Sequence, residues 1–249
     1  MSRLILPQLQ ELRQKKKKAF AVLIDPDKVQ TDQVLDLTRM ASACGVSFFF
    51  VGGSLLTNDH IQQVVPMIKL NCNIPVILFP GSIYQIVPTA DAIFFLSLIS
   101  GRNPELLIGQ QVLAAPLLKN SQLEVIGTGY MLIESGNNTT VNYISGTQPI
   151  PRHKPEIASC TAMAGEMLGL SALYMDGGSG AKYPISSEMI SAVRKHTDIP
   201  LIVGGGIRSV AEAERIWQAG ADVIVIGNAI EQNGGSLMQE VAALQRVLS

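Results

Sequence analysis

The sequence is poor in cysteine and histidine and contains no long apolar run. Its cysteines, Cys44, Cys72 and Cys160, are scattered without the spacing of a metal site, which predicts a reduced, cytoplasmic protein. The histidines are equally scattered, which argues against metal ligation by them. No apolar run reaches the roughly eighteen residues of a membrane span. The basic cluster at residues 15–18 follows the apolar part of the N-terminus, unlike a secretory signal.

A strong net charge is also missing. The formal net charge is −1, which argues against nucleic acid as the main partner. With 249 residues and 47% hydrophobic residues, the chain can form one α/β barrel or two small domains, each with a large core. The lysines at 15–18 could touch anionic lipid, although a solvated helix end is the favoured interpretation.

Apolar runs alternate with amphipathic segments along the chain. The runs are rich in β-branched and aromatic residues and lack clean alternation, which is typical of parallel strands covered on both faces. Amphipathic segments at 32–43, 187–196 and 210–219 predict helices between them. This regularity predicts one (β/α)8 TIM barrel over residues 1–249, with strands that begin near Phe20, Val46, Val76, Ile93, Val125, Leu173, Leu201 and Val223.

Three segments add detail to this barrel. Residues 9–18 predict a short helix over its bottom. Residues 80–92, with prolines at 80 and 88, leave little room for a helix, so we expect the barrel to lack a regular third helix and to have a groove in its wall. The polar connection at 135–155 is long for a compact domain, and both a lid and functionless disorder remain open.

Glycine turns follow three of the predicted strands. Gly204–Gly206 end the seventh run, Gly227-Asn228 end the eighth, and Gly177, Gly178 and Gly180 surround Ser179 after the sixth. Backbone N–H groups exposed at such turns bind anions, and the loops after strands 7 and 8 of a (β/α)8 barrel commonly bind phosphate. The alternative is that Gly204–Gly206 only permit a tight turn.

Polar side chains end the first two strands. Asp25 and Ser54 follow neighbouring strands and can converge, and a carboxylate with a hydroxyl suits Mg²⁺, whose shell substrate phosphates can complete. Asp27 is better interpreted as a turn former after Pro26. Ser54 has an equally good interpretation as a helix N-cap.

The sixth strand ends in Tyr174-Met175-Asp176. Tyr174 and Asp176 are two residues apart and therefore share one face of the strand, which points into the barrel mouth. Asp176 could accept hydrogen bonds from substrate hydroxyls, or a proton from a hydroxyl that attacks an electrophile. Alternatively, it caps the following turn.

Five motifs together resemble one family. IDPDK (24–28), VGGS (51–54), YMDGGSGA (174–181), VGGGIR (203–208) and IGNAIE (226–231) are similar to those of the geranylgeranylglyceryl phosphate synthases and their heptaprenylglyceryl phosphate relatives. The glycine turns alone would also fit barrels of histidine or tryptophan biosynthesis. IDPDK and YMDGGSGA favour the prenylglyceryl phosphate synthases over those barrels. The expected absence of a third helix also resembles this family.

The resemblance implies an enzyme of ether phospholipid biosynthesis. The C3 hydroxyl of sn-glycerol 1-phosphate would attack C1 of a prenyl diphosphate, geranylgeranyl diphosphate in the first instance, and release diphosphate. Asp25 and Ser54 would bind Mg²⁺, and Tyr174 and Asp176 would serve as catalytic residues that hold the glycerol hydroxyls. The substrate would contact Tyr174, Met175, Asp176, Gly177, Gly178, Ser179, Gly180, Gly205, Gly206, Gly227 and Asn228.

Two positions depart from the family pattern. Asp176 stands where the family usually has glutamate, and Leu23 stands where many heptaprenyl-type relatives have lysine, which favours the geranylgeranyl subgroup. Relatives are dimers or hexamers, and product release suggests a transient membrane contact. A phosphosugar isomerase or cyclase, or a non-catalytic phosphometabolite-binding barrel, remains an alternative. Candidates for contact with the prenyl tail, or simply for the core, are Phe79, Ile83, Tyr84, Ile86, Phe94, Phe95 and Leu96.

Overall fold

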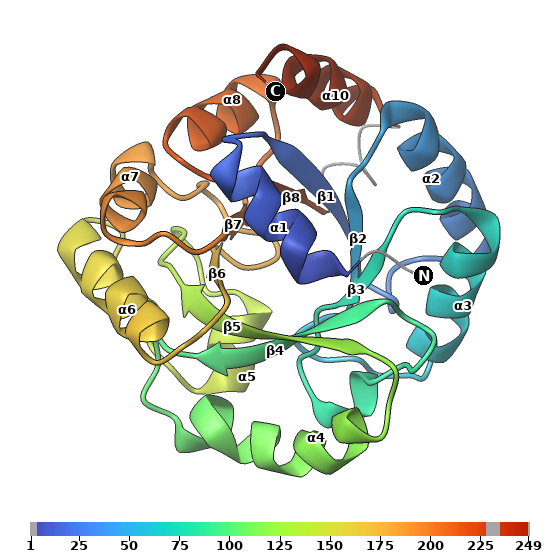
Figure 1. Ribbon diagram of the computed structural model, residues 1–249, viewed down its shortest axis with the longest axis horizontal. Coiled ribbons are helices and arrows are strands. Elements are labelled where there is room, and N and C mark those ends of the chain that lie inside the picture. The colour runs from blue at the N-terminus through green and yellow to red at the C-terminus, as the bar shows by residue number, and fades with distance from the viewer. Residues whose placement is uncertain (1–3, 228–234, 249) are drawn as a thin grey trace.

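The computed structural model describes residues 4–227 and 235–248 and forms a (β/α)8 barrel (Figure 1). Its eight strands are all parallel and pair in chain order, with β8 closing onto β1. All eight lie at the predicted runs. Their bounds are β1 Ala19–Ile24, β2 Phe48–Val51, β3 Val76–Leu78, β4 Ala92–Leu98, β5 Glu124–Leu132, β6 Ala172–Asp176, β7 Leu201–Gly204 and β8 Val223–Ile226.

Helices surround the strands as an outer ring (Figure 1). The amphipathic segments predicted at 32–43, 187–196 and 210–219 are confirmed as α2, α7 and α8. Among the described residues, no helix is both long and apolar enough for a membrane span. The helices of the ring are α2 Thr31–Cys44, α3 Ile61–Asn71, α4 Gln110–Lys119, α6 Pro155–Met167, α7 Ser187–His196, α8 Val210–Gln218 and α10 Ser236–Leu248.

Two apolar layers lie on either side of the strands. On β1, Ala19 and Ala21 belong to the cluster inside the barrel, whereas Phe20 and Val22 pack outward against the helices. The alternation follows from the period of two in a strand, and both faces are apolar because both are covered. Asp25 continues the inward-facing series one residue beyond β1, so its side chain lies at the barrel mouth.

Helix α1, Ile5–Gln14, crosses the end of the barrel opposite that mouth (Figure 1). Ile5 and Leu9 are buried in the inner cluster, and the backbone N–H groups of Ile5 and Leu6 donate to the Glu124 carboxylate. A carboxylate at a helix N-terminus satisfies unpaired amides and the helix dipole. The predicted bottom cover is confirmed, but the bounds 9–18 were wrong: the helix ends before Lys15, and Lys16 has a φ of 54°.

The predicted absence of a regular third helix is also confirmed. Between β3 and β4 lies only η1, one 3-10 turn at Ile83–Gln85. β3 is short, and its pairing with β4 ends at Leu78 opposite Ile93, although β4 continues to Leu98. The second half of β4 still pairs with β5 and contacts the segment of α4 through Ser97 and Gln111, but among the described residues it pairs with no strand on its β3 side. The barrel wall is therefore open between β3 and β4.

Candidate active site

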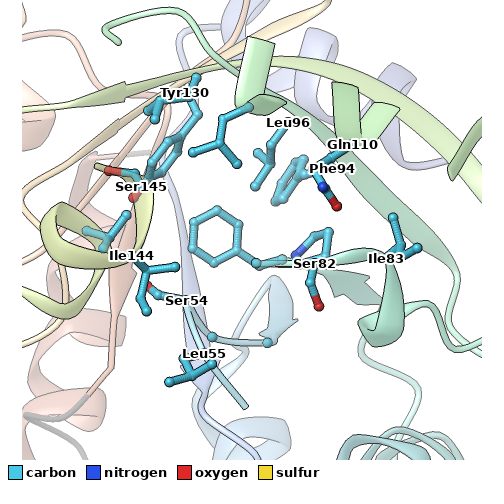
Figure 2. Close-up of a pocket in the computed structure, with 18 of the residues that line it drawn as sticks. Ser54, Leu55, Ser82, Ile83, Phe94, Leu96, Gln110, Tyr130, Ile144 and Ser145 are labelled. Carbon is cyan, nitrogen blue, oxygen red and sulfur yellow. The ribbon is translucent and has the colours of Figure 1, made fainter. Parts of the chain in front are cut away.

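A cavity of about 360 Å³ joins the barrel mouth to this opening in the wall (Figure 2). Its polar part is lined by Asp25, Ser54, Tyr130 and Asp176, which come from the ends of β1, β2, β5 and β6. Its apolar part is lined by residues of β4, η1 and α4. Catalytic residues of (β/α)8 barrels lie at this C-terminal end of the strands, so the cavity is the candidate active site.

Asp25 lies beside the β2 corner, and its convergence with Ser54 stays a prediction. A Cβ built on Gly53 would lie 3.4 Å from Asp25 Oδ1, so the residue before Ser54 lies beside that carboxylate, with room for no more than a methyl group between them. Lys28 Nζ pairs with Asp25 Oδ2 at 2.8 Å. Ser54 does not cap α3, because the N-cap of that helix is His60. The Ser54 hydroxyl is therefore not used by a helix end, and it faces the cavity.

These oxygens suit Mg²⁺, which typically takes one or two carboxylates and completes its shell with water and phosphate oxygens. Within the described residues, no group of three or more His, Cys, Asp and Glu side chains is arranged to hold a metal ion. Asp25 and Ser54 thus fit an ion shared with a substrate, and they do not form a closed protein cage.

Asp27 lies in the turn that follows β1, as the sequence favoured, and Lys28 N donates to Asp25 O across this turn. Asp27 also bonds a second loop. Its Oδ2 accepts hydrogen bonds from Thr57 N and Thr57 Oγ1 at 2.6 and 2.8 Å. It therefore ties the turn after β1 to the loop after β2.

Asp176 has hydrogen bonds to both carboxylate oxygens. Tyr130 Oη donates to Oδ2 at 2.6 Å, and Gly178 N donates to Oδ1 at 2.8 Å. Burial raises the pKa of Asp176, against the two hydrogen bonds, which lower it. Burial, with the Asp176 charge, raises the pKa of Tyr130 well above its usual value, so Tyr130 stays a proton donor. Asp176 therefore caps the following turn through Gly178 N, and the same carboxylate also lines the cavity.

The raised pKa of Asp176 predicts the stability of Asp176→Asn. Below the ordinary aspartate pKa of about 3.9 the carboxyl is neutral in the folded and unfolded states, and the variant should equal the wild type. As the pH rises from there through the folded-state pKa, the unfolded chain ionises first, which costs the wild type stability. We expect Asp176→Asn to be the more stable protein at pH 7, as measured by denaturant unfolding across pH. Equal stability at all pH values would contradict this assignment.

Tyr174 lies deeper than Asp176 on the same inward face. The side chain is only 1% exposed, and its ring stacks on Phe79 with the centroids 4.6 Å apart. The predicted shared face is confirmed. Tyr130 also lines the cavity beside Asp176, although no sequence motif marks it as a site residue.

The glycine corners after β6 and β7 touch each other. A Cβ on Gly205 would lie 2.7 Å from Gly177 N, and Gly205 and Gly206 have φ values of 87° and 76°. Side chains are therefore excluded at Gly205 both by its neighbour and by its backbone conformation. Because β7 and β8 are paired with Gly204 opposite Val225, the corner at Gly227 leaves the barrel beside them. Asn228 lies outside the described residues.

The segment 133–155 braces the β6 corner. Asn137 Nδ2 donates to Gly180 O at 3.1 Å, and its Oδ1 accepts from Lys182 N at 3.1 Å. The segment contains the short helix α5, Thr140–Ser145, whose residues line the cavity. From the other side, Arg208 Nη1 donates to Lys182 O at 3.1 Å. The glycine corner is thus held between two loops.

Most tail candidates line the apolar part of the cavity. Phe94 is fully buried on the inward face of β4, whereas Phe95 faces outward and is half-buried. Tyr84 is 84% exposed and points to solvent. The candidates that line the cavity are Phe79, Ile83, Ile86, Phe94, Phe95 and Leu96.

The fold and site define a class: a (β/α)8 barrel with adjoining glycine corners, a carboxylate pair across its mouth and an apolar opening in its wall. A family model described as the PcrB family matches residues 11–245, and the chain belongs to this family. It is similar to two proteins named geranylgeranylglyceryl phosphate synthase. The Spirosoma linguale protein is 55% identical over 223 residues, 90% of each chain. The Chitinophaga pinensis protein is 56% identical over 225 residues, 90% of this chain and 89% of the relative.

A solved structure agrees with these relatives. It is the (S)-3-O-geranylgeranylglyceryl phosphate synthase of Thermoplasma acidophilum in complex with sn-glycerol-1-phosphate. The TM-score is 0.91 at 32% sequence identity, and the match covers 97% of this chain and 98% of that chain. The resemblance found in the motifs is therefore confirmed.

Proposed function

We propose that this protein is a prenyltransferase that joins the C3 hydroxyl of sn-glycerol 1-phosphate to a long prenyl diphosphate, geranylgeranyl diphosphate in the first instance. One observation carries the proposal: a single cavity joins the polar barrel mouth to an apolar opening in the barrel wall. A small phosphate ester needs only the mouth. The opening suits a substrate with a long apolar tail. The named relatives and the glycerol phosphate bound to the Thermoplasma acidophilum protein support the same reaction.

The glycine corners are proposed to bind the glycerol phosphate. Backbone N–H groups at Gly180, Gly205 and Gly206, with Gly227 beside them, would face the phosphate. Gly177 N and Gly178 N donate within the corner, to Gly204 O and Asp176 Oδ1, so Gly177 and Gly178 stay predicted contacts that shape it. The carboxylate of Asp176 can accept a hydrogen bond from a glycerol hydroxyl. Met175, Ser179 and Asn228 stay predicted contacts. Tyr174, which lies deeper in the barrel than Asp176, stays a predicted catalytic residue that would hold the glycerol hydroxyls.

Asp25 and Ser54 are proposed to hold Mg²⁺ against the diphosphate on the opposite side of the mouth. The ion would neutralise charge on the leaving diphosphate. Lys28, paired with Asp25, adds a positive charge on the same side. Asp25 and Asp176 line one cavity from different strands, so the two substrates would meet between them.

The proposed reaction forms one bond, breaks one bond and transfers one proton. The C3 oxygen forms a bond to the prenyl C1, and the bond from C1 to the diphosphate oxygen breaks, with its electron pair leaving on diphosphate. Asp176, as the carboxylate, would take the hydroxyl proton, and its raised pKa makes it a better acceptor. Tyr130 holds that carboxylate in place through its hydrogen bond. Because an allylic carbon tolerates positive charge, positioning matters more than a strong base.

Exposed apolar residues lie beside the cavity. Leu55 and Ile144 line it and are still 55% and 44% exposed. A transient contact of this rim with a membrane surface would let a lipid product leave. Assembly into a dimer or hexamer and a cytoplasmic location stay predictions.

One incubation tests the proposed function against its rivals. The protein is mixed with glycerol 1-phosphate, Mg²⁺ and prenyl diphosphates of increasing length, and lipid products are identified by mass spectrometry. We expect a prenylglyceryl phosphate ether and released diphosphate, with geranylgeranyl diphosphate used best. Best use of heptaprenyl diphosphate would indicate the related subgroup. Tight binding of glycerol phosphate without an ether product would favour an isomerase, a cyclase or a non-catalytic binding protein.

A further inference from the structure

Gln85 is a buried polar residue in the short turn that replaces the third helix. It is only 3% exposed, and its side chain makes two hydrogen bonds to the backbone of one residue. Gln85 Nε2 donates to Gly53 O at 2.8 Å, and Gly53 N donates to Gln85 Oε1 at 3.2 Å. One side chain thus satisfies both backbone groups of Gly53, the residue directly before Ser54.

The chain around Gln85 packs closely on the β2 corner. We call residues 79–86 the strap. A Cβ on Gly52 would collide with Phe79 O, and a Cβ on Gly81 would collide with Gly53 O and lie 2.7 Å from Ser54 O. Gly53 also lies beside Asp25, since a Cβ built on Gly53 would lie 3.4 Å from Asp25 Oδ1. The backbone of Gly53 therefore contacts the strap and lies beside the carboxylate proposed to bind the metal.

No helix end fixes Ser54 in this loop. Helix α3 starts at Ile61 and has His60 as its N-cap, six residues beyond Ser54. Without Gln85, the N–H and C=O groups of Gly53 lose these partners, and the backbone at Gly53 would turn toward water to replace them. Rotation of the peptide group between Gly53 and Ser54 moves Ser54.

The strap also forms a wall of the apolar part of the cavity. Ile83 and Ile86, on either side of Gln85, line it, and Figure 2 shows Ile83 and Ser54 facing the same space. The strap is therefore in contact with both halves of the cavity.

We propose that Gln85 is a positioning residue that fixes Ser54 for the metal-bound diphosphate, so that the strap replacing the missing helix supports the leaving-group site. This inference rests on the proposed function. It predicts a loss confined to the diphosphate side of the cavity, because the glycine corners after β6 and β7 have no contact with Gln85 among the hydrogen bonds of the described residues.

The test compares Gln85→Leu with Gln62→Leu. Gln62 Nε2 donates to Ile86 O at 3.4 Å from the exposed side of the strap, so this control removes a bond to the strap but keeps the clamp on Gly53. In Gln85→Leu, we expect the half-saturating Mg²⁺ concentration and the KM for prenyl diphosphate to rise about tenfold, about 1.4 kcal/mol. The calorimetric Kd for glycerol 1-phosphate should stay within about twofold. Gln62→Leu should match the wild type in all three.

A second readout needs neither metal nor substrate. Hydrogen exchange of the Gly53 amide, followed by NMR in the ligand-free protein, should become at least about tenfold faster in Gln85→Leu, because its acceptor is lost. If Gln85→Leu does not fold, Gln85→Glu replaces it. That variant keeps an acceptor for Gly53 N but loses the donor to Gly53 O. We expect a raised half-saturating Mg²⁺ concentration, with hydrogen exchange at Gly53 nearer to that of the wild type.

Unchanged Gly53 exchange in Gln85→Leu would overturn the assignment. So would faster exchange with unchanged Mg²⁺ and prenyl diphosphate dependence, or an equal loss of glycerol phosphate affinity. If the wild type itself makes no ether product, the proposed function fails. If the wild type makes the product and Gln85→Leu behaves identically, only the role of Gln85 fails.

Discussion

Asp25→Asn is expected to lower metal-dependent turnover by about a thousandfold, about 4 kcal/mol of transition-state stabilisation. The substitution keeps the size of the side chain but removes the carboxylate charge that would hold Mg²⁺ beside Ser54. Initial rates at saturating Mg²⁺ and both substrates measure the loss. Binding of glycerol 1-phosphate, measured by calorimetry, should survive because the glycine corners lie on other strands.

Asp27→Asn is the matched control for this prediction. It removes the same charge two residues away, and an asparagine oxygen can still accept the hydrogen bond from Thr57 N. Asp27 also lines the cavity, but its Oδ2 is engaged by Thr57, so we expect turnover of Asp27→Asn to stay within about threefold of the wild type. Full activity of Asp25→Asn, or an equal loss in Asp27→Asn, would show that Asp25 does not bind the metal.

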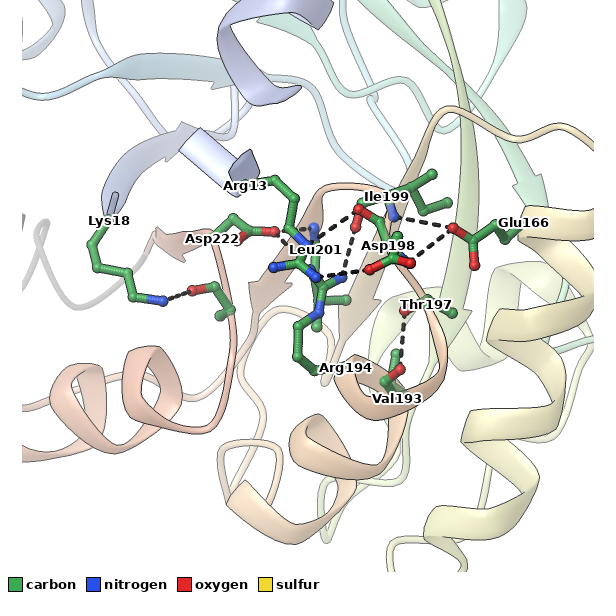
Figure 3. Close-up of polar contacts among 11 residues, drawn as sticks. Arg13, Lys18, Glu166, Val193, Arg194, Thr197, Asp198, Ile199, Leu201 and Asp222 are labelled. Carbon is green, nitrogen blue, oxygen red and sulfur yellow. Dashed lines mark hydrogen bonds and ion pairs between the residues drawn. The ribbon is translucent and has the colours of Figure 1, made fainter. Parts of the chain in front are cut away.

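Asp222→Ala is expected to lower the free energy of unfolding by about 3–5 kcal/mol. Asp222 lies at the end of the barrel opposite the mouth, just before β8 (Figure 3). Its Oδ2 accepts hydrogen bonds from Leu201 N at 2.8 Å and from Arg194 Nη1 at 3.3 Å. The Arg194 side chain is mostly buried, and burial lowers its pKa while Asp222 opposes that shift. Removing the carboxylate leaves this guanidinium buried without its partner.

A nearby aspartate provides the control for this stability prediction. Asp198 pairs with Arg13 at 3.0 Å in the same network, but its side chain is 96% exposed (Figure 3). Asp198→Ala should therefore cost less than about 1 kcal/mol. Denaturant unfolding of both variants checks the difference. Similar losses in both variants would mean that burial does not determine how much the Asp222–Arg194 pair contributes to the free energy of unfolding.

Much of the barrel was predictable from local sequence. Runs such as Leu201–Val203 are apolar on both faces because the strands are covered on both sides, and prolines at 80 and 88 exclude a regular helix from that interval. Each signal is contained in a few consecutive residues. The bounds of α1 were missed because the helix starts at a residue whose capping carboxylate, Glu124, is far away in the chain.

The candidate site was predictable where a residue directly ends a strand. Asp25 and Asp176 follow apolar runs, and a parallel barrel brings all such ends to one face. Tyr130 and Gln85 were not predictable in this way. In the sequence, Tyr130 resembles a core residue of β5, and only the structure shows its hydrogen bond to Asp176 on β6. Gln85 resembles a residue of a surface turn, and only the structure shows its bond to Gly53 after β2.

The sequence by itself determined the barrel, its missing third helix and the family motifs, because period, prolines and glycine turns act through near neighbours in the chain. Only the tertiary structure decided that β3 stops pairing with β4 early enough to open the wall, that Tyr130 holds Asp176, and that Gln85 supports the β2 corner. Each of these depends on contacts between side chains or strands far apart in sequence. The register and distance of such contacts are fixed only when the barrel closes.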